Sequence, residues 1–149
     1  MLTQEIKNSI DESILGWLAT ASAKGEPNCS PKEVFTYLGD SHILVAHIAS
    51  PISVRNVKEN ANVCLSFVHV YKQKGFKVTG IAEYIAESDG EFDALYQTIK
   101  PISGGFPVKG IIRISVTKAQ PIIAPSYFLV AGTTEESQIE SAKQAYNAV

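Results

Sequence analysis

The chain has 149 residues, which fits one domain with a real hydrophobic core. Its net charge of −2 disfavours a nucleic-acid partner, because phosphate backbones demand a basic face. No apolar run approaches the ~20 residues of a membrane span, and the N-terminus lacks the basic and apolar regions of a signal peptide. We therefore expect a cytoplasmic protein of one domain, residues 1–149, with no membrane partner.

The chain reads as short strands joined by turns, with helices between some of them. Apolar or alternating runs predict the strands, at residues 14–22, 27–38, 42–48, 63–68, 76–86 and 109–118. Helical spacing and capping residues predict the helices, at residues 2–10, 53–60, 92–99 and about 134–147. Pro27 and Pro31 cannot donate ladder hydrogen bonds, so the strand at 27–38 is expected at an edge or at a bulge.

Two capping boxes indicate where helices begin, and one pair of small residues marks a strand. Ser88 with Glu91, and Thr133 with Glu136, have the spacing that caps a helix start. Gly80 and Ala82 share one side of the strand at 76–86, where small residues indicate a close approach to another backbone or to a flat ligand.

About six strands in hairpin order, with few helices, predict a mainly β, α+β barrel. The chain contains no GxGxxG or GxxxxGK[ST] nucleotide motif and no GxSxG elbow. Cys29 and Cys64 form no CxxC pair, and the three histidines form no HxxxH pair, so we expect no metal site.

Two polar segments are candidates for an anion site. Ser30-Pro31-Lys32 offers a hydroxyl and an ammonium, although it also suits a solvated edge strand. Ser50, Ser53, Arg55 and Asn56 surround a helix start, whose free amides favour an anion, although simple capping explains them too. His47 ends the preceding strand beside this second segment, and a packing role is its alternative.

Three segments resemble the pyridoxamine 5′-phosphate oxidase-like family of FMN-binding split β-barrel proteins. They are LATASAKGEPNCSPKEVF, ILVAHIASPISVRNVKENANVCLSFV and GFKVTGIAEYI, in this order. The resemblance covers roughly residues 10–120, and NVKENANV followed by an alternating strand is its most specific part. It implies a six-stranded antiparallel split barrel with short flanking helices, usually a homodimer with FMN at the subunit interface.

The resemblance also implies a function and a set of cofactor-binding positions. These positions are Ser30, Pro31, Lys32, Val45, Ala46, His47, Ile52, Ser53, Arg55, Asn56, Lys77 and Thr79. The implied function is an FMN-dependent oxidoreductase acting on a small molecule. The alternatives are a flavin- or haem-binding module without turnover and a deazaflavin-dependent reductase. Family members often carry a basic residue where this chain has Ile52, so the phosphate is expected to depend on Lys32, Ser53, Arg55 and the helix amides.

Overall fold

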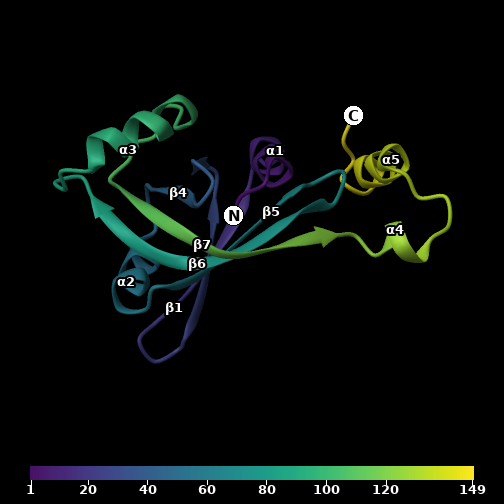
Figure 1. Ribbon diagram of the computed structural model, residues 1–149. Helices are drawn as coiled ribbons and strands as arrows, with labels where there is room; N and C mark the ends of the chain where they lie inside the picture. The colour runs from purple at the N-terminus through teal and green to yellow at the C-terminus, as the bar shows by residue number, and fades with distance from the viewer.

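The computed structural model describes residues 1–149 as one antiparallel sheet of seven strands flanked by short helices (Figure 1). The strands are β1 (Gly16–Ala21), β2 (Pro27–Lys32), β3 (Phe35–Leu38), β4 (His42–His47), β5 (Asn62–His69), β6 (Lys74–Ala86) and β7 (Gly110–Ile123). The helices are α1 (Gln4–Glu12), α2 (Pro51–Glu59), α3 (Phe92–Ile99), α4 (Ser126–Leu129) and α5 (Glu135–Ala145), with a 3₁₀ turn at Lys100–Ile102. The mainly β fold with flanking helices is confirmed, with seven strands where six were expected.

The order of strands across the sheet is β2-β1-β5-β6-β7-β4-β3. The long strands β6 and β7 form its centre, and their pairing carries an irregularity at Thr79/Gly80. Along β6, buried Val78 and Ala82 alternate with exposed Lys77 and Ile81, as expected for a strand with one buried face. The sheet therefore has an inner face on the core and an outer face open to solvent.

Gly80 marks a close approach of β6 to β7. A Cβ atom at this position would lie 2.4 Å from the backbone oxygen of Ser115 and 2.6 Å from Cγ2 of Ile114. Ala82 is buried in the same hydrophobic cluster as Ile114. Of the two expectations for Gly80 and Ala82, a neighbouring backbone or a flat ligand, the neighbouring backbone is confirmed at Gly80.

Two hydrophobic clusters stabilise the sheet. The larger cluster lies under α1, whose Leu2, Ile6 and Ile10 stripe is buried as its four-residue spacing predicted. The smaller one lies under α3, around Phe92 and Ile99. Neighbouring residues of β4 and β7 alternate between the two clusters, as Ile43 and Leu44 or Ile112 and Ile111 do, so the clusters lie on opposite faces of these strands.

The segment 27–38 does not form one strand. β2 pairs only with β1 and lies at one edge of the sheet, as its prolines predicted, whereas β3 pairs with β4 at the opposite edge. The chain crosses between them at Glu33 and Val34, where the buried Val34 accepts a backbone hydrogen bond from Ala46. The expected continuation was wrong because β3 pairs with the next strand, β4, and β4 in turn pairs with the distant β7, which places β3 at the edge opposite β2.

The two predicted capping boxes also differ from the structure. α3 begins without a side-chain cap, because the Glu91 carboxylate pairs with Arg113 of β7 instead of folding back on Ser88. α5 is capped one residue later than expected, by Thr134 and Ser137, which exchange side-chain and backbone hydrogen bonds.

The C-terminal segment forms a small lobe of its own. Figure 1 shows α4 and α5 standing at the far end of β6 and β7, away from α2 and α3. None of the helices combines the length and apolar character that crossing a membrane requires.

Candidate functional site

A cavity of about 490 Å³ lies between β2, the connection from β4 to α2, and the loop before β7. Its polar lining includes alternate residues of β2 and both serines at the start of α2: Asn28, Ser30, Lys32, Ser50 and Ser53. Its apolar lining includes Ile48, Ile52 and Phe106. The cavity therefore joins a polar end that suits an anion to an apolar wall that suits a hydrophobic ring.

Lys32 is the central residue of the polar end. Its side chain is only 5% exposed, and it takes part in no ion pair of the structure. Its Nζ donates a hydrogen bond to the Ser50 hydroxyl, and burial lowers the pKa of the amine below its ordinary value. A buried ammonium without a carboxylate is costly, so an anion in this cavity would offset its lost hydration.

The start of α2 adds hydroxyls and free amides to the same end. Ser50 precedes the helix without capping it, so its hydroxyl remains turned to Lys32. Ser53 is fully buried, and its Oγ lies 2.9 Å from Oγ of Ser30. Pro51 opens the helix, and the amides of its first turn have no acceptor within the helix. One ammonium, three hydroxyls and a helix start thus face one another, which is a suitable arrangement for a phosphate group.

His47 borders this arrangement at the end of β4. Its Nδ1 accepts a hydrogen bond from the Ser50 amide at 3.4 Å, and its ring meets the edge of Tyr84 at 5.9 Å. Burial lowers the pKa of His47, and the positive charges of Lys32, Lys109 and Lys58 lower it further. The surroundings of His47 are therefore cationic, and the one carboxylate that lines the cavity, Glu33, is exposed and unpaired.

The structure brings half of the predicted cofactor positions to the cavity. Those that line it are Ser30, Pro31, Lys32, Ala46, Ile52 and Ser53, and His47 lies directly beside them. Ile52 is 47% exposed and places an apolar side chain at the helix start, where a cation would be most useful. The polar end of the cavity therefore has Lys32 and the serine hydroxyls but no second cation.

The other predicted positions lie elsewhere. Val45 is buried in the larger hydrophobic cluster, and Arg55 is exposed on α2 away from the cavity. Asn56 is buried behind the helix start, where its Nδ2 donates to Thr20 at 3.0 Å and its Oδ1 has no partner. Lys77 and Thr79 lie on the outer face of β6, and Thr79 lines a separate hollow of that face.

Asn28 and Phe106 line the cavity although neither was among the predicted positions. Asn28 shares a face of β2 with Ser30 and Lys32, so strand alternation could have identified it. Phe106 comes from the loop between the 3₁₀ turn and β7, and no local pattern links that loop to β2. No group of three or more His, Cys, Asp or Glu residues is arranged to hold a metal ion.

Several solved structures share this fold. HupZ of Group A Streptococcus is 26% identical, with a TM-score of 0.68 over 83% of this chain and 99% of that chain. An FMN-binding protein from Syntrophomonas wolfei is 21% identical, with a TM-score of 0.66 over 81% of this chain and 86% of that chain. An F420 reductase is 19% identical, with a TM-score of 0.62 over 80% of this chain and 98% of that chain.

No curated protein matches the chain in sequence. The family model described as pyridoxamine 5′-phosphate oxidase matches residues 2–123, which include the whole sheet and every residue of the cavity. The chain therefore belongs to the pyridoxamine 5′-phosphate oxidase family.

Proposed function

We propose that this chain binds FMN and acts as an FMN-dependent oxidoreductase on a small molecule. The observation that carries the proposal is Lys32, a buried ammonium that donates to the Ser50 hydroxyl, lines the same cavity as Ser30 and Ser53, and takes part in no ion pair. The phosphate of FMN would supply the missing anion. The cavity volume of about 490 Å³ is within the range of small-molecule and cofactor sites.

The roles of the chain's own residues follow from the arrangement of the cavity. Lys32 and the hydroxyls of Ser30, Ser50 and Ser53 would hold the phosphate end. Ile48, Ile52 and Phe106 would contact the apolar ring and exclude water from one side of it. When bound, the flavin supplies the electron and hydride transfer, and the protein supplies position and electrostatics.

Two alternatives involve the same cavity. One is a flavin- or haem-binding module without turnover; the other is a deazaflavin-dependent reductase, a class represented among the solved structures with this fold. The visible spectrum of the purified protein separates flavin, deazaflavin and haem. Bleaching of a bound flavin by NADH or NADPH then separates an oxidoreductase from a passive binder.

We further propose that the chain forms a homodimer, with the flavin near the subunit interface. The cavity is open on one side, and a second subunit would cover the part of a flavin that this chain leaves exposed. Light scattering of the purified protein tests the dimer independently of the cofactor.

The phosphate end is tested by comparing FMN with riboflavin, which lacks the phosphate. Wild-type protein is expected to bind FMN more tightly, and Lys32→Met is expected to lose about 10- to 100-fold of FMN affinity, as for a charge-assisted contact. Riboflavin affinity should change little in the same variant. Quenching of flavin fluorescence measures both constants.

Lys24→Met is the matched control, because Lys24 is exposed in the β1–β2 turn away from the cavity. It should bind both flavins as the wild type does. If FMN and riboflavin bind equally to the wild type, or if Lys32→Met lowers both affinities alike, Lys32 does not hold the phosphate. If neither flavin binds, the flavoprotein proposal fails as a whole.

A further inference from the structure

The side of α2 that faces the β1–β2 hairpin is polar. Ser53 and Asn56, which lie three residues apart on this side, are 0% and 1% exposed. Three hydrogen bonds cross from the helix to the hairpin: Ser53 to Ser30 at 2.9 Å, Asn56 to Thr20 at 3.0 Å and Asn60 to the Ser22 carbonyl at 3.3 Å. A series of neutral hydrogen bonds therefore holds α2 on the hairpin.

The bond between Ser30 and Ser53 competes with the binding of an anion in the cavity. Each hydroxyl carries one proton, and the bond between the two serines uses one of these protons. Both hydroxyls can donate to a phosphate group only if they release each other. The Ser50 hydroxyl has no such conflict, because it accepts from Lys32 and keeps its own proton for the anion. An anion that uses every hydroxyl of the polar end therefore removes one of the three bonds between α2 and the hairpin.

The bond between Asn56 and Thr20 then becomes the one nearest the cavity. Asn56 lies about one helical turn after Ser53, so a shift of Asn56 moves the first turn of α2 with it. Thr20 belongs to the β1–β2 ladder, which continues to Ser30 and Lys32. Neither Asn56 nor Thr20 lines the cavity. Their bond can therefore act on a ligand only by fixing the distance between the start of α2 and β2.

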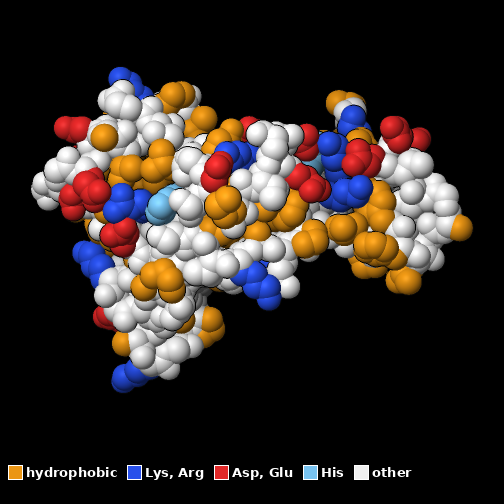
Figure 2. All heavy atoms as spheres, in the orientation of Figure 1, with side chains coloured by type: hydrophobic (Ala, Val, Ile, Leu, Met, Phe, Trp, Pro, Cys, Tyr) orange, Lys and Arg blue, Asp and Glu red, His pale blue; other side chains and the backbone are white.

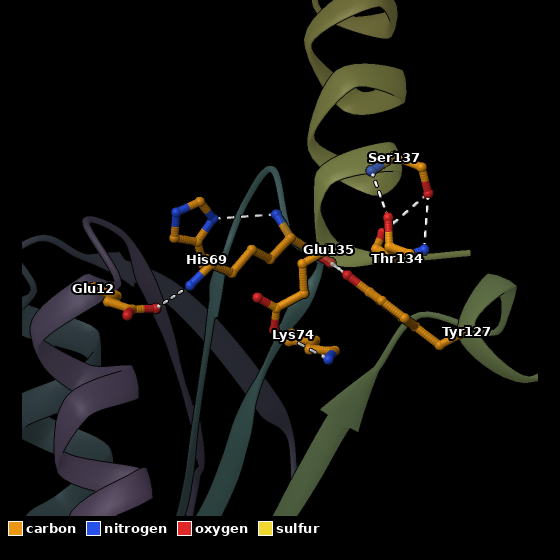
Figure 3. A network of polar contacts seen from close by, with 8 residues as sticks. Glu12, His69, Lys74, Tyr127, Thr134, Glu135 and Ser137 are labelled. Atoms are coloured by element: carbon orange, nitrogen blue, oxygen red, sulfur yellow. Dashed lines mark hydrogen bonds and ion pairs between the residues drawn. The ribbon is translucent and has the colours of Figure 1, made fainter. Parts of the chain in front are cut away.

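This bond differs from the contacts that hold the C-terminal lobe. Figure 2 shows acidic and basic side chains next to one another at both ends of the molecular surface. Lys74 and Glu135, 3.2 Å apart, form a pair of this kind between the β5–β6 hairpin and α5 (Figure 3). Water screens such pairs, so they constrain a helix weakly. Asn56 and Thr20 are 1% and 3% exposed, so their bond is shielded from water and fixes α2 more firmly.

The second polar atom of the Asn56 side chain has no partner. Its Oδ1 is the one buried side-chain nitrogen or oxygen atom of the chain without a hydrogen bond. A buried acceptor without a partner lowers the stability of the fold, and an apolar side chain at this position would avoid that loss. Stability alone therefore does not account for an asparagine here. A role in positioning α2 accounts for it, because an apolar residue could not bind Thr20.

We propose that Asn56 is a positioning residue that makes the cavity selective for ligands with a phosphate monoester. Through Thr20 it holds the start of α2 where Ser30, Ser53 and Lys32 reach one phosphate group together. A ligand without a phosphate leaves the bond between Ser30 and Ser53 intact and gains nothing from this spacing. The inference rests on the proposed function, because the phosphate of FMN is the group that it concerns.

Thr20→Val tests the inference, because it removes the acceptor of Asn56 with little change of side-chain shape and without touching the cavity. FMN affinity should fall by about 3- to 10-fold, as for one lost hydrogen bond, whereas riboflavin affinity should stay the same. Quenching of flavin fluorescence measures both. Thr20→Ser, which keeps the hydroxyl, should restore the wild-type preference for FMN.

A double variant tests whether the two residues act through one bond. Asn56→Ala should lose FMN affinity as Thr20→Val does, and the two changes together should lose no more than either alone. Losses that add up would overturn the inference, because Asn56 and Thr20 would then act separately.

Asn60→Ala is the matched control, because it removes the bond to the Ser22 carbonyl at the other end of α2. It should lower the urea midpoint of the ligand-free protein, as Thr20→Val does, and yet keep the preference for FMN. If Thr20→Val lowers both flavin affinities alike, or changes neither, Asn56 is merely structural and only this inference fails. A wild type that binds neither flavin, or binds both equally, would overturn the proposed phosphate site and this inference with it.

Discussion

Among single residues, Lys32 carries a charge that the folded chain does not neutralise. Burial lowers the pKa of its amine below the ordinary value of 10.5. The unfolded chain therefore binds more protons than the folded one between the lowered pKa and 10.5, and stability rises with pH in that window. Below the window the full cost of burying the charge is present, so the ligand-free protein is less stable at neutral pH than an uncharged variant would be.

Lys32→Met is thus expected to bind FMN less well and yet to fold more stably. Relief worth about 1 kcal/mol would raise the Tm of the ligand-free protein by about 2–4 °C at neutral pH. The difference from wild type should shrink at strongly alkaline pH, where the wild-type amine loses its proton. Thermal unfolding at both pH values measures the effect, and Lys24→Met should show neither change. A lower Tm for Lys32→Met at neutral pH would mean that the ammonium stabilises the ligand-free fold.

His47 predicts a second pH window, at lower pH, in which stability also rises with pH. Its pKa is lowered by burial and then by Lys32, Lys109 and Lys58, so the folded chain resists protonation below the ordinary value of 6.5. The unfolded chain takes up the proton first, and stability is lost as pH falls through 6.5 toward the folded pKa. His47→Asn, which keeps an acceptor for the Ser50 amide, should make the Tm fall less steeply between neutral pH and pH 5. His42→Asn is the control, and an unchanged pH slope in His47→Asn would contradict the prediction.

Sequence periodicity could predict which residues face the cavity only within one element. Alternation along β2 placed Ser30 and Lys32 together and would have added Asn28. Helical spacing on α2 would have placed Arg55 outward, since buried Ser53 and Asn56 define the inner side. The distance between elements is not a periodic property, so the sequence could not indicate that the Phe106 loop reaches this cavity.

At the scale of elements, the close pairing of β6 with β7 requires a residue without a Cβ atom at position 80, which is Gly80. Gly80→Ala should lower the free energy of unfolding by about 1–3 kcal/mol, because its Cβ would lie 2.4 Å from the Ser115 carbonyl oxygen. Gly90→Ala is the matched control, since nothing lies within 4 Å of its added Cβ. Urea unfolding of both variants measures the difference. Equal stabilities would show that β7 moves aside at no cost.

Helices and strands were predictable where their own residues decide them. The stripe of α1, the edge position of β2 and the buried face of β6 all follow from local spacing or from proline chemistry. The predictions that were wrong concern features that depend on contacts with residues distant in sequence. β3 lies at the far edge because its neighbour β4 pairs with the distant β7, and α3 lacks its expected cap because Arg113 of β7 binds Glu91.

At the scale of the whole molecule, the barrel and the C-terminal lobe differ in how they are stabilised. Every residue of the two hydrophobic clusters, and every residue packed against them, lies before residue 120. Beyond Ile123 only Ala124 and Ala142 are buried, and the lobe's ion pair and cation–π contacts lie near the surface. The lobe should therefore contribute little to the stability of the folded chain.

Removal of residues 124–149 tests whether the barrel is stable without the C-terminal lobe. Since both clusters stay intact, the shortened chain should still unfold cooperatively, with a loss of about 1–3 kcal/mol for the few partly exposed contacts. The wild-type Tm should rise with protein concentration, because the proposed association stabilises the folded chain by mass action. Thermal unfolding at several concentrations measures both effects, and Ile102→Glu, which leaves the lobe in place, should behave as wild type. A shortened chain that loses cooperative unfolding would show that the lobe belongs to the folding unit, and a concentration-independent wild-type Tm would contradict the dimer.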